Sequence, residues 1–470
     1  MSTEIPFTYR FHPVGQGLFS TGTLLPWQQG VAPFHWTFDC GSMAKKADWI
    51  SQVSWYRDLV LQGDTLNLLC ISHFDKDHVS GLGDLLNGKH VDTVVIPYYT
   101  PIERLVLGAM QERRRGQDDP EYNEFLSNPV AFLIEHAASI RQIVVIHRSP
   151  PDAPNWPYGG NLRPDSPVLS LKDRPLNTDR NHRRDESESE REQWHLKVWE
   201  PRSSDDPPPI AAGFPQSLFP WDGRLCFVGE TCHLRAIAST IIGFCPEWEF
   251  LFFHKPESAD VVSKLIWDID RILEEDEELA GHRPTLAEAL RDEGTRKKIT
   301  DAYHRAFGRG KRFNTAGVCM YSGPFADKQD WTAISIPQVW HGVPPVIPWS
   351  TSWELCPPWL GRHRRASILY SGDANFQPKQ HRDEIKQLLT DARWQRISIL
   401  QVPHHGSEHN WQVGSANEFH HQWSVMSADP QYKHHHPDQP VLLDLLGRNP
   451  LLVDRIVGVG WSGVCSFDVP

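Results

Sequence analysis

Four side chains able to bind a metal lie within six residues of one another, in His73-Phe74-Asp75-Lys76-Asp77-His78. The cluster directly follows the apolar run Leu66 to Ile71, separated from it by one serine. Imidazoles and carboxylates that are crowded together lose solvation and perturb one another's charge unless a cation lies between them. The segment therefore predicts a metal site at the C-terminal end of a buried strand.

Two later segments repeat this order of an apolar run followed by ligand-type residues. Residues 368–374 end in Gly372-Asp373, and residues 399–407 end in the pair His404-His405. Side chains that follow neighbouring strands at one edge of a sheet can converge on one point, as a site with several ligands requires. We therefore expect Asp373 and His404 or His405 to join the His73–His78 cluster.

Patterns around these segments predict the elements that hold them. The run 66–71 is apolar at nearly every position, as in a strand covered on both faces. Strands are also expected at 34–38, before a turn at 39–42, and at 91–97, and a helix is expected to begin at 79–86. The predicted fold class is α/β, with a sandwich-like core.

The pattern changes after residue 104. Residues 173–193 are strongly polar and low in complexity, which is typical of a surface loop or linker. Strand-like runs return at 225–228 and 248–253, and helices are expected at about 257–276 and from Thr285, which begins a capping box. We interpret this middle region as a long insertion into the core.

The composition of the chain limits which classes of function and which cellular locations are expected. The chain has 470 residues and a formal net charge of −12, which opposes loose binding along a nucleic-acid backbone but not a local basic groove. None of the eight cysteines forms a C-x-x-C pair, and several lie in apolar runs, as expected of reduced core residues. With no signal pattern at the start and no apolar run long enough to span a bilayer, we expect a cytoplasmic protein without membrane contact.

The complete motif set resembles one family. The pattern His73-x-Asp75-x-Asp77-His78 resembles the HxHxDH motif of the metallo-β-lactamase fold superfamily. Aspartate in place of the second histidine resembles the branch that contains the soluble C-terminal domain of the DNA-uptake competence protein ComEC. Five further segments resemble motifs of that branch: Val14-Gly15-Gln16-Gly17, Asp39-Cys40-Gly41, Ser371-Gly372-Asp373, Pro403-His404-His405-Gly406-Ser407 and His436-Pro437.

The resemblance implies a metallo-β-lactamase-like αββα sandwich with a large insertion. Residues 1–104 would form the N-terminal half of the core and residues 313–470 the C-terminal half. Residues 105–312 would form the insertion, with its charged linker and helices, and offer a surface for a protein partner.

The resemblance also implies two divalent metal ions, Mn²⁺, Zn²⁺ or Mg²⁺, that share a bridging hydroxide. Asp77 and His78 would hold one ion, and His73 and Asp75 would contribute to the other. Asp373 would bridge them, and either His404 or His405 would complete the set. The oxygen of Asp75, where relatives supply nitrogen, favours Mn²⁺ or Mg²⁺ more than an all-histidine site does.

Four residues receive other roles from the same resemblance. His436 is expected to act at the scissile bond, as a catalytic or substrate-binding group beside the catalytic Asp77, with the alternative that it only orients a ligand. Ser407 is expected to contact substrate. Asp39 and Asn314 are expected to hydrogen-bond near the ligands; Asn314 begins a segment that resembles N-x-x-S but carries Gly317 at its last position.

The leading functional hypothesis is a metal-dependent phosphodiesterase or nuclease that cleaves DNA through a metal-bound hydroxide. A second hypothesis is a hydrolase of a small phosphate ester or cyclic nucleotide, which the acidic net charge favours. A third is a regulatory protein on the same fold that binds a partner through residues 105–312. The substrate and the metal stay open at this point.

Overall fold

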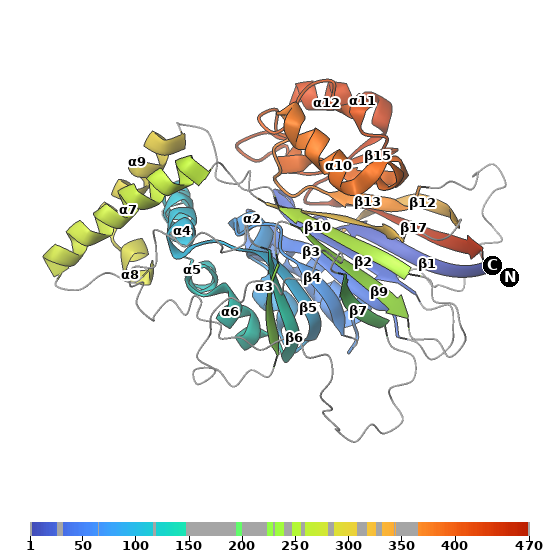
Figure 1. Cartoon of the computed structure of the whole chain (residues 1–470), viewed down its shortest axis with the longest axis horizontal. Helices are drawn as coiled ribbons and strands as arrows, with labels where there is room; N and C mark the ends of the chain where they lie inside the picture. The colour runs from blue at the N-terminus through green and yellow to red at the C-terminus, as the bar shows by residue number, and fades with distance from the viewer. Residues whose placement is uncertain are drawn as a thin grey trace, which may run out of the picture.

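The computed structural model describes residues 2–25, 32–63, 65–115, 119–146, 194–199, 223–228, 231–238, 247–254, 259–280, 286–307, 317–325, 331–342, 344 and 365–468. Their strands form two mixed sheets (Figure 1). In spatial order the nine-stranded sheet contains β12 (Trp331–His341), β17 (Val457–Asp468), β1 (Ser2–Phe11), β2 (Gly17–Leu24), β3 (Phe34–Ser42), β4 (Leu66–Cys70), β5 (His90–Pro97), β6 (Ser139–Ile146) and β8 (Arg224–Val228). The eight-stranded sheet contains β16 (Pro450–Val453), β15 (Trp423–Ser427), β14 (Ile397–Gln401), β13 (Ser367–Tyr370), β11 (Val318–Pro324), β10 (Glu247–His254), β9 (Thr231–Ala238) and β7 (Trp194–Trp199).

Each sheet is antiparallel on one side and parallel on the other. In the nine-stranded sheet, pairing is antiparallel from β12 to β3 and parallel from β3 to β8. In the eight-stranded sheet, it is antiparallel from β7 to β13 and parallel from β13 to β16. The residues of interest follow the C-terminal ends of β4, β13 and β14, which all lie in parallel pairings.

One apolar core lies between the two sheets. Aromatic side chains of both sheets meet there: the ring of Trp36 lies 5.3 Å from that of Phe250, and the ring of Phe38 stacks on that of Tyr370 at 4.6 Å. The hydroxyl of Tyr9 donates to the carbonyl of Ala366 across the interface. These contacts hold the strand ends of the two sheets in a defined relation.

Helices cover the outer faces (Figure 1). The outer face of the nine-stranded sheet is covered by α1 (Lys46–Trp55), α3 (Leu82–Leu86), α4 (Pro101–Arg115), α5 (Pro120–Ser127) and α6 (Pro129–His136). Helices α7 (Ala259–Ala280), α8 (Leu286–Arg291) and α9 (Glu293–Phe307) extend this layer as a lobe around α4. The eight-stranded sheet is covered by α10 (Lys379–Arg396), α11 (Ser415–Glu418) and α12 (Gln439–Leu445).

The predicted strands at 66–71 and 91–97 are confirmed as β4 and β5, but two local predictions were wrong. The expected turn at Asp39 to Ser42 is the continuation of β3, with Asp39 in a left-handed conformation (φ 57°) at a register shift against β2. The expected helix at 79–86 is divided into α2 (Lys76–Val79), which begins inside the metal motif, and α3. Gly81 separates the two helices because its amide bonds to the carbonyl of Cys40 in β3.

The expected insertion at 105–312 supplies strands to both sheets. β6 and β8 extend the nine-stranded sheet, whereas β7, β9 and β10 belong to the other. The predicted strands at 225–228 and 248–253 and the first predicted helix are confirmed as β8, β10 and α7. The polar segment 173–193 and Thr285 lie outside the described residues, and the division of the chain at residues 104 and 313 stays a prediction.

The described helices include none that is both long and apolar enough to cross a membrane. Six cysteines fall within the described ranges, and all six are free thiols: Cys40, Cys70, Cys226, Cys232, Cys319 and Cys465.

Candidate metal centre

The His73–His78 motif bridges the end of β4 and the start of α2, and glycines let it lie against the sheet. A Cβ at Gly41 of β3 would come within 2.6 Å of the backbone nitrogen of His78. A Cβ at Gly17 of β2 would come within 2.8 Å of the carbonyl oxygen of Asp77. The backbone of α2 therefore packs directly on the backbone of β2 and β3, which the glycines of both early motifs make possible.

Asp373 reaches the same place from the other sheet. It follows β13 through Gly372, whose φ of 52° is left-handed and favours glycine. A Cβ at Gly372 would lie 3.0 Å from the side chain of Ser72, directly beside His73. The amide of Gly372 donates to the side-chain carbonyl of Gln401 at the end of β14, which ties the two strand ends together.

The pair His404-His405 follows β14 in an unusual backbone. Both histidines and Gly406 have positive φ angles, at 48°, 59° and 82°. In an extended strand, adjacent side chains point to opposite faces. The left-handed turn instead brings both imidazoles toward one side, with ring centroids 5.9 Å apart. Left-handed backbone at a non-glycine residue is strained, and such strain concentrates at functional sites.

Four histidines share one arrangement, in which the Nδ1 atom is tied by a hydrogen bond. Nδ1 of His78 lies 2.8 Å from Asp39 Oδ2, and Nδ1 of His405 lies 2.6 Å from the carbonyl oxygen of Ser427. Both partners can only accept, so both Nδ1 atoms carry the proton. A neutral imidazole then has its lone pair on Nε2, the atom that remains for a metal.

The other two histidines are tied through polar side chains. Ser72 Oγ donates to Asp39 Oδ2 at 2.6 Å and so accepts from Nδ1 of His73 at 2.8 Å. The amide nitrogen of Asn410 donates to the carbonyl of Asp373, which turns its Oδ1 toward Nδ1 of His404, at 2.6 Å. Again Nδ1 is the donor and Nε2 is left facing the site.

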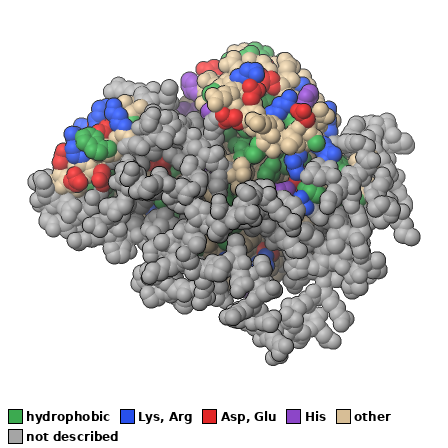
Figure 2. Space-filling model, viewed as in Figure 1, with side chains coloured by type: hydrophobic (Ala, Val, Ile, Leu, Met, Phe, Trp, Pro, Cys, Tyr) green, Lys and Arg blue, Asp and Glu red, His purple; other side chains and the backbone are tan. Residues whose placement is uncertain are grey.

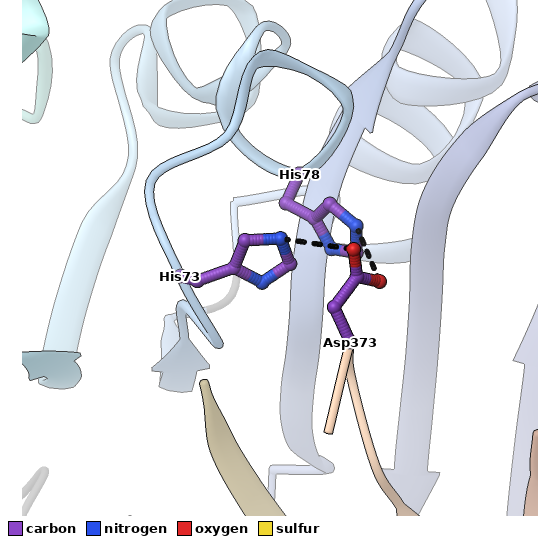
Figure 3. Close-up of side chains that lie close together, drawn as sticks. All are labelled: His73, His78 and Asp373. Carbon is purple, nitrogen blue, oxygen red and sulfur yellow. Dashed lines mark ion pairs between the residues drawn. The ribbon is translucent and has the colours of Figure 1, made fainter. Parts of the chain in front are cut away.

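The Nε2 atoms converge on two carboxylates. His73 Nε2 and His78 Nε2 each face one oxygen of Asp373, at 3.6 and 3.5 Å (Figure 3). Both nitrogens are buried and make no hydrogen bond among the described residues. These separations are too long for hydrogen bonds but resemble the ~3–3.5 Å between two ligands of one ion with bonds of about 2.1 Å. His404 Nε2 lies at a similar 3.7 Å from Asp373.

The side chains form two groups that can each hold a metal ion and that share His78. One contains His73, His78 and Asp373, and the other contains Asp77, His78 and His405. In the second group, His405 Nε2 lies 3.1 Å from Asp77 Oδ2. When Nε2 carries a proton, it donates to Asp77; when it does not, both facing atoms are acceptors, and a cation between them would relieve their repulsion.

The electrostatics of the site keep its carboxylates ionised. Burial alone would raise the pKa of Asp373, but the charges of His404, His73 and His78 hold it well below its usual range. Burial opposes ionisation of Asp77 as well, yet the hydrogen bond from His405 and the charges of His78 and His405 lower its pKa. Negative charge is therefore present where a cation would bind.

His78 shows the opposite effect. Burial alone would lower its pKa, but the carboxylates of Asp39 and Asp373 raise it well above its usual range. Its ring lies between these two carboxylates, with Nδ1 on Asp39 and Nε2 facing Asp373. A proton on Nε2 thus occupies the position that a metal would take.

The predicted ligands differ in their placement. His73, Asp77, His78, Asp373 and His405 lie in the two groups, and His404 borders the first. Asp75 lies in neither group; it is the N-cap residue of α2, and its carbonyl accepts from the amide of His78. Metal binding by Asp75 stays a prediction.

The residues with other predicted roles are also located. Asp39 accepts from His78 and Ser72, as expected of a group that orients a ligand. The buried ring of His436 lies 6.1 Å from that of His404. Ser407 Oγ accepts from the amide of His409 within the turn. Substrate contact by His436 or Ser407 stays a prediction, and Asn314 lies outside the described residues.

Three partners of the histidines escaped the sequence analysis. Ser72 was treated only as a spacer, although its position directly before His73 was a signal. Asn410, five residues after His405, had no motif to mark it. Ser427 acts through its backbone carbonyl, which leaves no trace in residue type.

No protein-family model matches the chain, and comparison with curated proteins gives no match. The site must therefore be judged by its own chemistry. Buried imidazole nitrogens with fixed tautomers and ionised carboxylates form a donor set suited to divalent transition metals.

Proposed function

We propose that this chain is a metal-dependent hydrolase of the metallo-β-lactamase fold, similar to the ComEC branch, that cleaves phosphodiester bonds in DNA. The observation that carries the proposal is the convergence of four histidine Nε2 atoms on Asp77 and Asp373. Two mixed sheets packed face to face, with helices outside, agree with that fold. The ends of β4, β13 and β14, which carry the ligand motifs, meet at this point.

The residues present fit a pair of divalent ions. His73, His78 and Asp373, with His404 beside them, would hold one ion, and Asp77, His78 and His405 the other. Such ions, when bound, acidify water and neutralise charge on a phosphoryl oxygen. The sequence argument for Mg²⁺ used the oxygen of Asp75 as a ligand, but Asp75 lies in neither group. The two groups are rich in imidazole nitrogens, and such a donor set favours Zn²⁺ or Mn²⁺ over Mg²⁺.

The chain's own residues supply the remaining functions. Asp39, Ser72, Asn410 and the carbonyl of Ser427 hold the four imidazoles in orientation and fix their protons on Nδ1. His436 lies beside His404, with its Nδ1 3.4 Å from Asp438 Oδ1. This position suits a group that gives a proton to a leaving oxygen, with Asp438 to stabilise its charged form.

A small phosphate ester is the second candidate substrate. Figure 2 shows Lys and Arg interspersed with Asp and Glu over the described part of the helical lobe, and the chain carries a net charge of −12. A long duplex would gain little from such a mixed surface. Binding to a protein partner through residues 105–312 is the third candidate, and such binding can accompany catalysis.

The test is hydrolysis by purified protein with Zn²⁺, Mn²⁺ or Mg²⁺. The substrates are single-stranded DNA, double-stranded DNA, RNA and a cyclic dinucleotide. Asp77→Asn and Asp373→Asn remove ligand charge, whereas His420→Ala changes an exposed histidine outside both groups as a matched control. We expect metal-dependent cleavage of DNA by wild type and His420→Ala, and at least a hundredfold less by the ligand variants. Cleavage of cyclic dinucleotide alone would reject the nuclease, and full activity of Asp77→Asn would reject the metal mechanism.

A further inference from the structure

A second polar site lies on the outer face of the nine-stranded sheet. In β1, Tyr9 and Phe11 point into the core between the sheets, so Thr8 and Arg10 point to the opposite face. That face is covered by α1, whose Trp55 belongs to the outer apolar cluster. Arg10 is 6% exposed. Covered strand positions normally carry an apolar side chain or a paired charge. At this position of β1, the charged side chain of Arg10 is nearly buried.

Three other buried arginines in the described residues have hydrogen-bond partners. Arg393 makes two bonds to the carboxylate of Glu249, and Arg382 makes two to Glu418. Arg104 donates to the carbonyls of Leu126 and Ser127. These partners supply what a buried guanidinium requires, since its five N–H donors lose water on burial.

Arg10 lacks such partners within the described part of the chain. Its guanidinium makes no hydrogen bond and no ion pair there, and its contact is with the face of the Trp55 ring, at 5.4 Å. A cation–π contact uses one face of the guanidinium and leaves its N–H edges uncommitted. Burial lowers the pKa of Arg10 to about 10, so the side chain is still charged at neutral pH.

The neighbouring polar groups do not neutralise this charge. His12 directly follows β1, with its ring 6.0 Å from Trp55. Burial, followed by the charge of Arg10, holds the pKa of His12 well below its usual value, although a hydrogen bond with Gln52 opposes this shift. Gln52 lies on the same side of α1 as Trp55, one turn away, and is 5% exposed. The side chains of His12 and Gln52 interact with each other, and the carbonyl oxygen Oε1 of Gln52 has two lone pairs, so it can accept a further hydrogen bond. Within the described part of the chain, a cation without a carboxylate partner and a buried acceptor therefore lie on one face of the sheet.

We propose that Arg10, beneath Trp55, is the anchor of a binding site for a phosphate group. The fork of a guanidinium matches two oxygens of an oxyanion, and the stacked indole fixes the plane of the fork. A hydrogen phosphate also carries a hydroxyl, which can donate to Oε1 of Gln52 while other oxygens accept from Arg10. Sulfate and carboxylates have acceptors only, so this pair of side chains selects phosphate over them.

The site is separate from the metal centre. Arg10 and Gln52 contribute to neither metal-binding group, and the proposal does not rest on the hydrolase activity. Inorganic phosphate and the phosphate of a nucleoside monophosphate share the required chemistry. Comparing the two tells whether the ligand is the free ion or an ester.

The experiment is calorimetric titration of metal-stripped protein with phosphate, sulfate, a nucleoside 5′-monophosphate and the unphosphorylated nucleoside. The variants are Arg10→Met, which keeps the stem and removes the charge, Arg10→Lys, which keeps the charge and loses the fork, and Arg141→Met. Arg141 is a matched control because its side chain is 54% exposed and pairs with Asp92. Circular dichroism checks that each variant is folded.

We expect phosphate, or the monophosphate, to bind one site per chain in wild type and Arg141→Met. Affinity should fall at least about tenfold in Arg10→Met and by less in Arg10→Lys, and sulfate should bind more weakly than phosphate. Equal phosphate affinity in folded Arg10→Met would overturn the proposal. So would the absence of phosphate and monophosphate binding to wild type, which would leave Arg10 as a cation–π pair alone. Sulfate binding as tight as phosphate would reject the role of Gln52.

Discussion

At the scale of single residues, the strongest feature of the site is that its histidines are oriented before any metal arrives. Each of His73, His78, His404 and His405 has its Nδ1 proton engaged by a fixed acceptor. The carboxylate of Asp39 serves two of them, one directly and one through Ser72. Partners of this kind raise metal affinity because the ligand does not have to select its tautomer or rotate on binding.

This dependence predicts the effect of Asp39→Asn. The amide keeps the size of the side chain but loses the charge and presents one donor where two acceptors stood. We expect metal affinity, measured by competition with a chelator, to fall about 10–100-fold. Asp92→Asn, at a partly exposed aspartate of β5, is the control and should keep wild-type affinity. Unchanged affinity in Asp39→Asn would mean that the tautomer of His78 is set in another way.

The raised pKa of His78 predicts how metal binding depends on pH. At neutral pH the metal-free protein holds a proton on His78, whereas Asp77 and Asp373, with lowered pKa values, hold none. A metal must displace that proton, so apparent affinity should rise with pH up to the pKa of His78, about tenfold per unit for one proton. Titration between pH 6 and 9 in buffers of different ionisation enthalpy should show proton release. Affinity independent of pH, with no release, would contradict this account.

At the scale of elements, the position of α2 determines where two ligands, Asp77 and His78, lie. Its backbone packs against Gly17 and Gly41 on the sheet side. On the other side, the Tyr122 hydroxyl of α5 donates to the carbonyl of Phe74, at 3.0 Å, and Lys76 pairs with Asp119, the N-cap of α5. The motif is thus held between β3 and a helix from the region expected to be an insertion.

Gly41→Ala tests this packing. The added methyl group would meet the backbone of His78 at 2.6 Å, so α2 must shift. We expect the free energy of unfolding in denaturant to fall by about 1–3 kcal/mol, as for other overpacked sites, and metal affinity to fall with it. Gly447→Ala is a matched control, because a Cβ there meets nothing within 4 Å. Wild-type stability and metal affinity in Gly41→Ala would show that α2 is not held by this contact.

At the scale of the whole molecule, the site joins the two sheets. Ligands after β4 of the nine-stranded sheet meet ligands after β13 and β14 of the other, and the chain segments that carry them are about 300 residues apart. Packing of aromatic side chains such as Trp36 and Phe250 between the sheets sets the distance across which they meet. The metal centre therefore depends on correct assembly of both halves.

The sequence predicted the three strand ends, because apolar runs followed by histidine or aspartate are local signals. It also predicted the five residues of the two metal-binding groups: His73, Asp77, His78, Asp373 and His405. It did not predict that β7, β9 and β10 would join the second sheet, since those pairings connect residues far apart and depend on the whole core. It placed Asp75 among the ligands by resemblance, which stays a prediction, but did not predict that Asp75 would be the N-cap residue of α2. Ser72 and Asn410 became visible only through their hydrogen bonds.

The most direct test of the central claim is the metal content and metal positions of the protein. We predict that wild-type protein loaded with Zn²⁺ or Mn²⁺ retains two ions per chain, and that anomalous scattering from crystals locates them against the two groups that share His78. Asp373→Ala should lose at least one of these ions, whereas His420→Ala should keep both. Wild-type protein that binds no metal, or ions located away from His78, Asp77 and Asp373, would contradict the account.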